Sequence, residues 1–151
     1  MNELTKIRVE MFRRGMFDFI TKPGRKRHAK QHEALCALTD PKTRELLYGG
    51  AAGGAKSWTG VSWLTFSALA YPGTRYFIGR NQLNDLREST SVTIDKVFNA
   101  YGITEKDYRY NGQDNYYEFS NGSEITPKPV YVETSHTALR YIAAMITRLA
   151  S

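Results

Sequence analysis

The stretch that decides the fold is Tyr48-Gly49-Gly50-Ala51-Ala52-Gly53-Gly54-Ala55-Lys56-Ser57. Glycine has no Cβ, so a backbone with four glycines in six positions turns tightly and comes close to a ligand. In a phosphate-binding loop (P-loop), backbone N–H groups surround the phosphates, a lysine reaches the β- and γ-phosphates, and a hydroxyl binds Mg²⁺. The stretch therefore predicts a nucleotide site with Ser57 as the metal ligand, formed by Gly50, Ala51, Ala52, Gly53, Gly54, Ala55, Lys56 and Ser57.

The match to the P-loop pattern has one departure. Counting back from Lys56, Gly50 takes the first glycine position and Ala55 stands where the last glycine is expected. Alanine suits that position, because the chain enters a right-handed helix there. The alternative is a glycine-rich turn between a strand and a core helix, without a ligand. The order of strand, glycines, Lys-Ser and helix favours the P-loop.

The flanking residues have the character that a P-loop needs, which is a strand before it and a helix after it. Residues 44–48 form a short, partly apolar run that predicts the strand. Pro72-Gly73 ends the predicted helix. That helix is apolar nearly all round and hence buried, through Trp58, Val61, Trp63, Leu64, Phe66, Leu69 and Tyr71.

A second strand and a second long helix are predicted next. The strand covers residues 75–79 and ends at Arg80, at the end of a strand where open α/β sheets bind ligands. A contact of Arg80 with phosphate and a structural salt bridge both remain open. The helix starts at about residue 82, with Asn81 as cap and Gly102 at its end. Its apolar stripe consists of Leu83, Leu86, Thr90, Ile94, Val97 and Tyr101. Strands that alternate with helices predict a parallel sheet flanked by helices.

The pattern changes after residue 102. Short β-type runs at 108–110, 116–119 and 124–125 are separated by Asn111-Gly112 and Asn121-Gly122, which are strong hairpin signals. They predict a β-meander inserted in the α/β unit. Stacking on nucleic-acid bases is one use for its tyrosines. Pairing of the rings across strands is the favoured alternative.

The two ends of the chain give weaker patterns. Residues 1–20 predict a short amphipathic helix, and residues 29–39 predict a helix with Gln31 in its first turn. Residues 127–129 predict an extended linker, followed by a short apolar strand that ends at Glu133. A last amphipathic helix is predicted from Leu139, Ile142, Ala143, Ile146 and Leu149.

Charge and cysteine content limit the class of protein. The formal net charge of +6 favours a polyanionic partner such as nucleic acid. Basic residues crowd positions 13–30, where they form either a phosphate-contacting surface or a flexible basic arm. The single Cys36 fits a reducing cytoplasm and is expected to be a small buried apolar residue. Neither a secretion signal nor a membrane span is predicted.

Together these segments resemble the ATPase domain of the large terminase subunit of tailed bacteriophages, the motor that packages DNA. The resemblance covers roughly residues 29–125. It implies a basic arm or helix at 1–28 and a partial P-loop ATPase domain at 29–151. It rests on Lys30-Gln31 with Ala34-Leu35, the P-loop variant at 48–57, Phe77-Ile78-Gly79-Arg80 with Leu83, Leu86, Arg87 and Ser89, and Phe119-Ser120-Asn121-Gly122-Ser123-Glu124-Ile125.

The resemblance implies a role for several residues. Gln31 matches the glutamine that reads the adenine edge, a task that suits an amide with a donor and an acceptor; the alternative is a solvent-facing helix residue. Glu133 matches the catalytic glutamate that activates water, and the alternative is a surface glutamate after a strand. Val132 stands where the family has a metal-binding aspartate. The implied cofactors are ATP and Mg²⁺.

The implied partners are double-stranded DNA, the portal protein, the small terminase subunit and further copies of the chain in a ring. The implied location is the cytoplasm of the bacterial host. The family continues into a nuclease domain of metal-binding carboxylates, for which the sequence has no candidate cluster, so the resemblance implies an incomplete fold. Two other functions remain open. One is a helicase-like P-loop ATPase, and the other is a basic DNA-binding remnant without catalysis.

Overall fold

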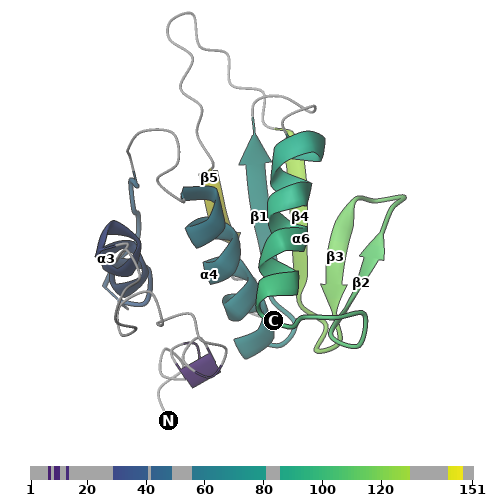
Figure 1. Cartoon of the computed structure of the whole chain (residues 1–151), viewed down its shortest axis with the longest axis horizontal. Helices are drawn as coiled ribbons and strands as arrows, with labels where there is room; N and C mark the ends of the chain where they lie inside the picture. The colour runs from purple at the N-terminus through teal and green to yellow at the C-terminus, as the bar shows by residue number, and fades with distance from the viewer. Residues whose placement is uncertain are drawn as a thin grey trace, which may run out of the picture.

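The computed structural model describes residues 7, 9, 10, 13, 29–40, 42–48, 56–80, 86–129 and 143–147. The helices and strands among them confirm a mixed α/β fold (Figure 1). In chain order they are α3 (Ala29–Leu38), α4 (Lys56–Ala70), β1 (Arg75–Arg80), the π-helix η1 (Leu86–Thr90), α6 (Ser91–Ala100), β2 (Tyr108–Asn111), β3 (Tyr116–Phe119), β4 (Glu124–Pro129) and β5 (Ala143–Thr147).

The strands of the described residues form one five-stranded sheet in the order β2-β3-β4-β1-β5. β1 and β4 run parallel, with Arg75 beside Glu124 and Arg80 beside Pro129. The other three pairs, β2 with β3, β3 with β4 and β1 with β5, are antiparallel. The predicted β-meander is confirmed. The predicted parallel sheet is correct only for β1 and β4, so the sheet is mixed.

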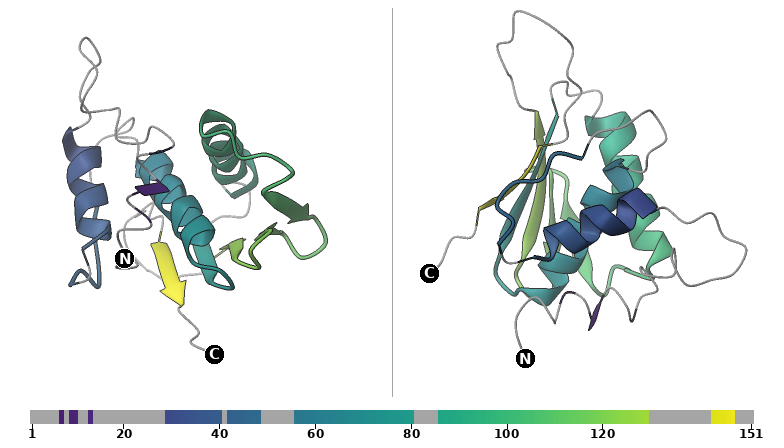
Figure 2. Two further views of the ribbon diagram at one scale, coloured as in Figure 1. Left: turned by 90° about the horizontal axis from the view of Figure 1, so that it is seen from below. Right: turned by 90° about the vertical axis from the view of Figure 1, so that its left-hand side faces the viewer.

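The three helices lie side by side on one face of the sheet, with α4 between α3 and α6 (Figure 2). The position of α4 explains why Thr59 and every residue from Val61 to Ala68 are buried, as its all-round apolar pattern predicted. Its Thr65 hydroxyl donates to the Val61 carbonyl oxygen at 2.8 Å and so needs no water. The core lies between these helices and the sheet, around Phe66, Phe98 and Phe119.

The strand predicted at residues 44–48 is wrong, because this segment has no regular secondary structure. Its two leucines are exposed, Leu46 by 40% and Leu47 by 81%. β1 has β4 on one side and β5 on the other, so no place is left beside β1 for a further strand. A short apolar run does not by itself determine which strand it pairs with. Here β4 and β5 pair with β1 instead.

The helix predicted near the end of the chain is also wrong. Residues 143–147 form β5, which pairs antiparallel with β1 so that Ala144 lies opposite Ile78 and Thr147 opposite Arg75. A short apolar run does not distinguish a helix from a buried strand, and its β-branched residues Ile146 and Thr147 favour a strand.

The predicted linker at 127–129 belongs to β4. Proline lacks the N–H that a central strand normally donates, so its presence in the sheet needs a reason. The Asn115 side-chain amide donates to the Pro127 carbonyl oxygen at 3.0 Å. A residue in a strand directs its N–H and its C=O to the same side. The ring nitrogen of Pro127 therefore faces the β3 side, and the pairing with β1 continues to Pro129.

The predicted turns are largely confirmed. Gly73, Gly102 and Gly122 have φ values of 70°, 66° and 80°, which residues with a Cβ rarely adopt. They end α4, end α6 and turn β3 into β4. The Asn111-Gly112 turn differs from expectation, since Asn115 takes the positive φ of 56° and Gly112 does not.

Helix α3 confirms the helix predicted at 29–39, with Ala34 and Leu35 buried against the core. Residues 7, 9, 10 and 13 are helical, as the prediction for residues 1–20 expected, and Ile7 is part of the core. The prediction of a buried Cys36 is wrong, because the thiol is exposed. It lies 3.5 Å from Nε2 of His32, one helical turn earlier.

Candidate nucleotide site

Three of the predicted site residues lie at the same edge of the sheet. α4 ends at Ala70 and β1 runs back from Arg75, so the start of α4 and the end of β1 share one edge (Figure 1). β4 is parallel to β1 and also ends there, with Pro129 beside Arg80. We call this the carboxyl edge. Lys56, Ser57 and Arg80 therefore lie at the same end of the sheet, the end where open α/β sheets bind ligands.

Lys56 and Ser57 form the first turn of α4, and both are half-buried. The first four N–H groups of a helix have no partner within the helix, and the helix dipole makes this end electropositive. A lysine and a hydroxyl in such a turn suit a phosphate group and the metal ion that accompanies it. The helix predicted after the loop is confirmed, and a phosphate site at its start stays a prediction. The preceding residues of the predicted loop, 49–55, lie outside the described residues.

Gln31 has an unusual environment for a glutamine. It lies in the first turn of α3 and is only 2% exposed, so the alternative of a solvent-facing residue is wrong. Among the residues that the structure describes, neither Oε1 nor Nε2 has a hydrogen-bond partner. A buried amide without partners destabilises the fold, which makes it a candidate for binding a ligand.

Arg80 is the last residue of β1, and its side chain contacts η1. Its Nη2 lies 3.4 Å from the Ser89 hydroxyl oxygen, and its Nε is buried. Ser89 and Thr90 belong to the π-helix that precedes α6. π-helical turns occur frequently at functional sites. The contact joins the end of β1 to η1.

The tyrosines of the meander serve the core. Tyr108 and Tyr117 pack on Phe98, with ring centroids 4.5 and 5.6 Å away, and Tyr110 packs on Tyr117 at 4.9 Å. The structure thus favours the cross-strand alternative over base stacking for these three. Burial, strengthened by the charge of Asp95, raises the pKa of Tyr117 well above its ordinary value. Burial also raises the pKa of Tyr101, against hydrogen bonding from Trp58 and Ser62 that lowers it.

The sequence analysis did not single out a second set of residues, which lies on the face of the sheet opposite the helices. Phe77, Tyr116 and Thr126 are half-buried there, whereas Tyr76, Tyr117 and Ile125 beside them are buried. The alternation of polar and apolar residues at 124–128 is the signal that would have found Thr126. Residues 76–78 are all apolar and carry no such signal for Phe77.

Glu133, Val132 and the predicted helix cap Asn81 lie outside the described residues. Among the residues that are described, no three His, Cys, Asp or Glu side chains form a group that could hold a metal ion. None of the described helices is long and apolar enough to cross a membrane. Comparisons with models of protein families, with curated proteins and with solved structures found no match to this chain.

Proposed function

We propose that this chain is the ATP-binding part of a DNA packaging motor of the phage large-terminase type. The observation that supports it most is the carboxyl edge itself. Lys56 and Ser57 open a buried helix there, and Arg80 ends the parallel strand beside it. This arrangement agrees with the P-loop pattern and with the ordered set of motifs on which the resemblance rests.

Gln31 supports the choice of an adenine nucleotide. Its buried amide offers one donor group and one acceptor to a ligand, which matches the donor and acceptor on the edge of adenine. A ligand that satisfies both removes the penalty of leaving them unpaired. Ser57 would hold Mg²⁺ through its hydroxyl. Mg²⁺ keeps several waters and binds phosphate oxygens beside few protein ligands, so one hydroxyl fits this mode. The bound metal would neutralise charge on the phosphates.

A second form of the function is binding without hydrolysis. The motor requires a glutamate that activates water, and the proposed residue is Glu133. Val132 lacks the carboxylate expected before it. Both sides of β1 are also occupied, by β4 and by β5, which leaves no position beside β1 for another strand. These observations favour a module that binds ATP and turns it over slowly or not at all.

The proposed function is tested by titrating the chain with Mg²⁺-ATP in a calorimeter. We expect Lys56→Ala to abolish binding with no change in the circular dichroism spectrum. Lys96→Ala, which removes an exposed lysine of α6, is the matched control and keeps the affinity. Equal affinity of the Lys56→Ala and unchanged chains would refute the nucleotide site.

Phosphate release with and without duplex DNA separates the two forms. Release that is lost in Glu133→Gln supports a hydrolysing motor. Binding without release supports the non-hydrolysing module. Duplex binding without nucleotide binding would instead support the basic DNA-binding alternative.

A further inference from the structure

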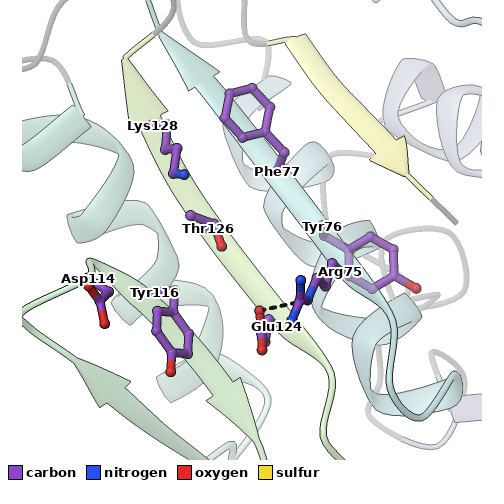
Figure 3. A pocket seen from close by; sticks show the side chains of 8 residues that line it. All are labelled: Arg75, Tyr76, Phe77, Asp114, Tyr116, Glu124, Thr126 and Lys128. Atoms are coloured by element: carbon purple, nitrogen blue, oxygen red, sulfur yellow. Dashed lines mark ion pairs between the residues drawn. The ribbon is translucent and has the colours of Figure 1, made fainter. Parts of the chain in front are cut away.

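The open face of the sheet, opposite α4 and α6, carries a row of side chains across three strands. Phe77 on β1 is the register partner of Thr126 on β4. Tyr116 on β3 extends the row, one step beyond the pair of Tyr117 and Ile125. Figure 3 shows the three side chains along a shallow hollow of about 440 Å³. Strands lie about 4.8 Å apart, so the two rings are about 10 Å apart across β4.

The neighbouring row on the open face is charged and internally paired. Glu118 on β3 lies beside Glu124 on β4, and an arginine flanks each of them. Arg109 Nη2 lies 2.7 Å from Glu118 Oε2, and Arg75 Nε lies 3.2 Å from Glu124 Oε2. These pairs neutralise both carboxylates without closing the hollow.

The other side of the row carries two charges of opposite sign. Lys128 is exposed and stands opposite Gly79, which adds no side chain to the face. Asp114 is exposed, and its Oδ2 accepts a hydrogen bond of 3.4 Å from the Asn111 amide. The ammonium of Lys128 forms no ion pair within the described part of the chain and is available to an anion.

These features restrict the partner. A partner protein that docked an apolar surface here would bury the six charged groups of the open face, which is costly even when they are paired. In a DNA duplex the bases stack on one another and present only their edges in the grooves, so a duplex offers no base face to the two rings. Unpaired bases stack on aromatic rings whatever their sequence, and their amino groups donate to carboxylates. Only the last partner uses the rings, the hydroxyl and the charges together.

We propose that the open face binds single-stranded nucleic acid. One base stacks on Phe77 and another on Tyr116, the Thr126 hydroxyl contacts a base edge between them, and Lys128 binds a phosphate. This site is separate from the nucleotide site at the carboxyl edge and does not depend on it.

The test is fluorescence anisotropy of a labelled single-stranded deoxycytidylate oligomer of about 12 nucleotides, a length within the span of known single-strand sites. Each cytosine carries the amino group that the carboxylates can accept from. Phe77→Leu and Tyr116→Leu keep apolar bulk but remove the ring. Each is expected to weaken binding about 5- to 100-fold. Tyr110→Leu is the matched control, because Tyr110 is an exposed tyrosine that packs on Tyr117 on the other face. It leaves the affinity unchanged.

The salt dependence provides a second readout. Lys128→Ala reduces the slope of log affinity against log salt by about 0.7, the value for one phosphate contact on a single strand. Lys96→Ala does not alter the slope. Unchanged affinity in both ring variants would overturn the proposal, as would a duplex that competes as well as the single strand. A Lys56→Ala chain that loses ATP but keeps the oligomer shows that the two sites are independent. Loss of the oligomer in Lys56→Ala but not in the ring variants would place single-strand binding at the carboxyl edge and overturn the proposal.

Discussion

Tyr76 and Ile78 of β1 point into the core beneath the helices, while Arg75 and Phe77 of the same strand lie on the open face. β4 divides in the same way, with Ile125 in the core and Thr126 on the open face. The covered face is fixed by burial and by rings that contact one another. On the open face the side chains form exposed ion pairs, and strand pairing sets their positions. Replacing one of these side chains therefore changes the stability of the fold little. A mutation therefore has different consequences on the two faces, and the following variants test that difference.

The largest effect is expected on the covered face from Phe98→Ala. Phe98 is 1% exposed and contacts the rings of Tyr108, Tyr117 and Phe119. Removal of a buried ring costs its transfer free energy and leaves a cavity, together about 3–5 kcal/mol. Urea unfolding followed by circular dichroism measures the loss. Val92→Ala on the exposed side of α6 should lose far less. Similar losses in the two variants would contradict the assignment of the core.

The next largest effect is expected at the end of α4 from Asn121→Ala. The Asn121 amide donates to the carbonyl oxygens of Ala68 at 2.8 Å and Leu69 at 3.2 Å. It thereby holds the turn between β3 and β4 against the helix. The Ala68 oxygen keeps the Ser123 hydroxyl at 2.7 Å, so the loss falls on the Leu69 oxygen. An acceptor left without its partner costs about 1–3 kcal/mol. Asn99→Ala, an exposed position of α6, is the control. Equal melting temperatures for the two variants would show that this contact does not stabilise the fold.

Gln31→Met connects stability with the nucleotide site. The substitution keeps the shape of the side chain and removes the two unpaired polar atoms. We expect the free energy of unfolding without ligand to rise by about 1 kcal/mol, since an unsatisfied buried amide is lost. We expect the preference for ATP over GTP to fall in the same variant. A variant that is less stable but keeps its preference would refute the adenine role.

Alkaline pH should weaken the covered face. Burial raises the pKa of Tyr117 above the value of about 10 that the phenol has in the unfolded chain. Its contribution to stability is complete below pH of about 10 and is lost as the pH rises beyond it, because the unfolded chain releases the proton first. Tyr117→Phe should flatten the decline of unfolding free energy above that pH. Leu47→Ala, at an exposed position outside the sheet, is the control and should leave the decline as it was. If the unfolding free energy declined equally with pH in all three chains, the raised pKa of Tyr117 would be refuted.

The local signals in the sequence predicted much of the covered face and little of the sheet order. Pro72-Gly73 and Asn121-Gly122 mark turns through backbone geometry, and the all-round apolar pattern of α4 marks burial, so these predictions were confirmed. Two short apolar runs, 44–48 and 143–147, were predicted wrongly. Their structure depends on which segment pairs with β1. That competition is not encoded in either run alone.

The candidate site divides in the same way. Lys56, Ser57 and Arg80 lie at one edge because a helix and the strand that follows it are antiparallel, which the sequence order already implies. The burial of Gln31 could not be predicted, because it depends on how α3 packs beside α4. Tyr116 and Phe77 lie on the same face because of the register in which β3, β4 and β1 pair. This register is set by the tertiary structure and could not be read from the local sequence.

The smallest effect is expected on the open face from Arg75→Ala. The side chain of Arg75 is 66% exposed and forms an ion pair of 3.2 Å with Glu124. Exposed ion pairs contribute about 0.2–1 kcal/mol, and salt screens that contribution. We expect a small loss in urea unfolding at low salt that vanishes at high salt. Arg44→Ala, at an exposed position outside the sheet, is the control. A loss that persists in high salt would mean that the open face is held by packing, and the contrast between the two faces would then be wrong.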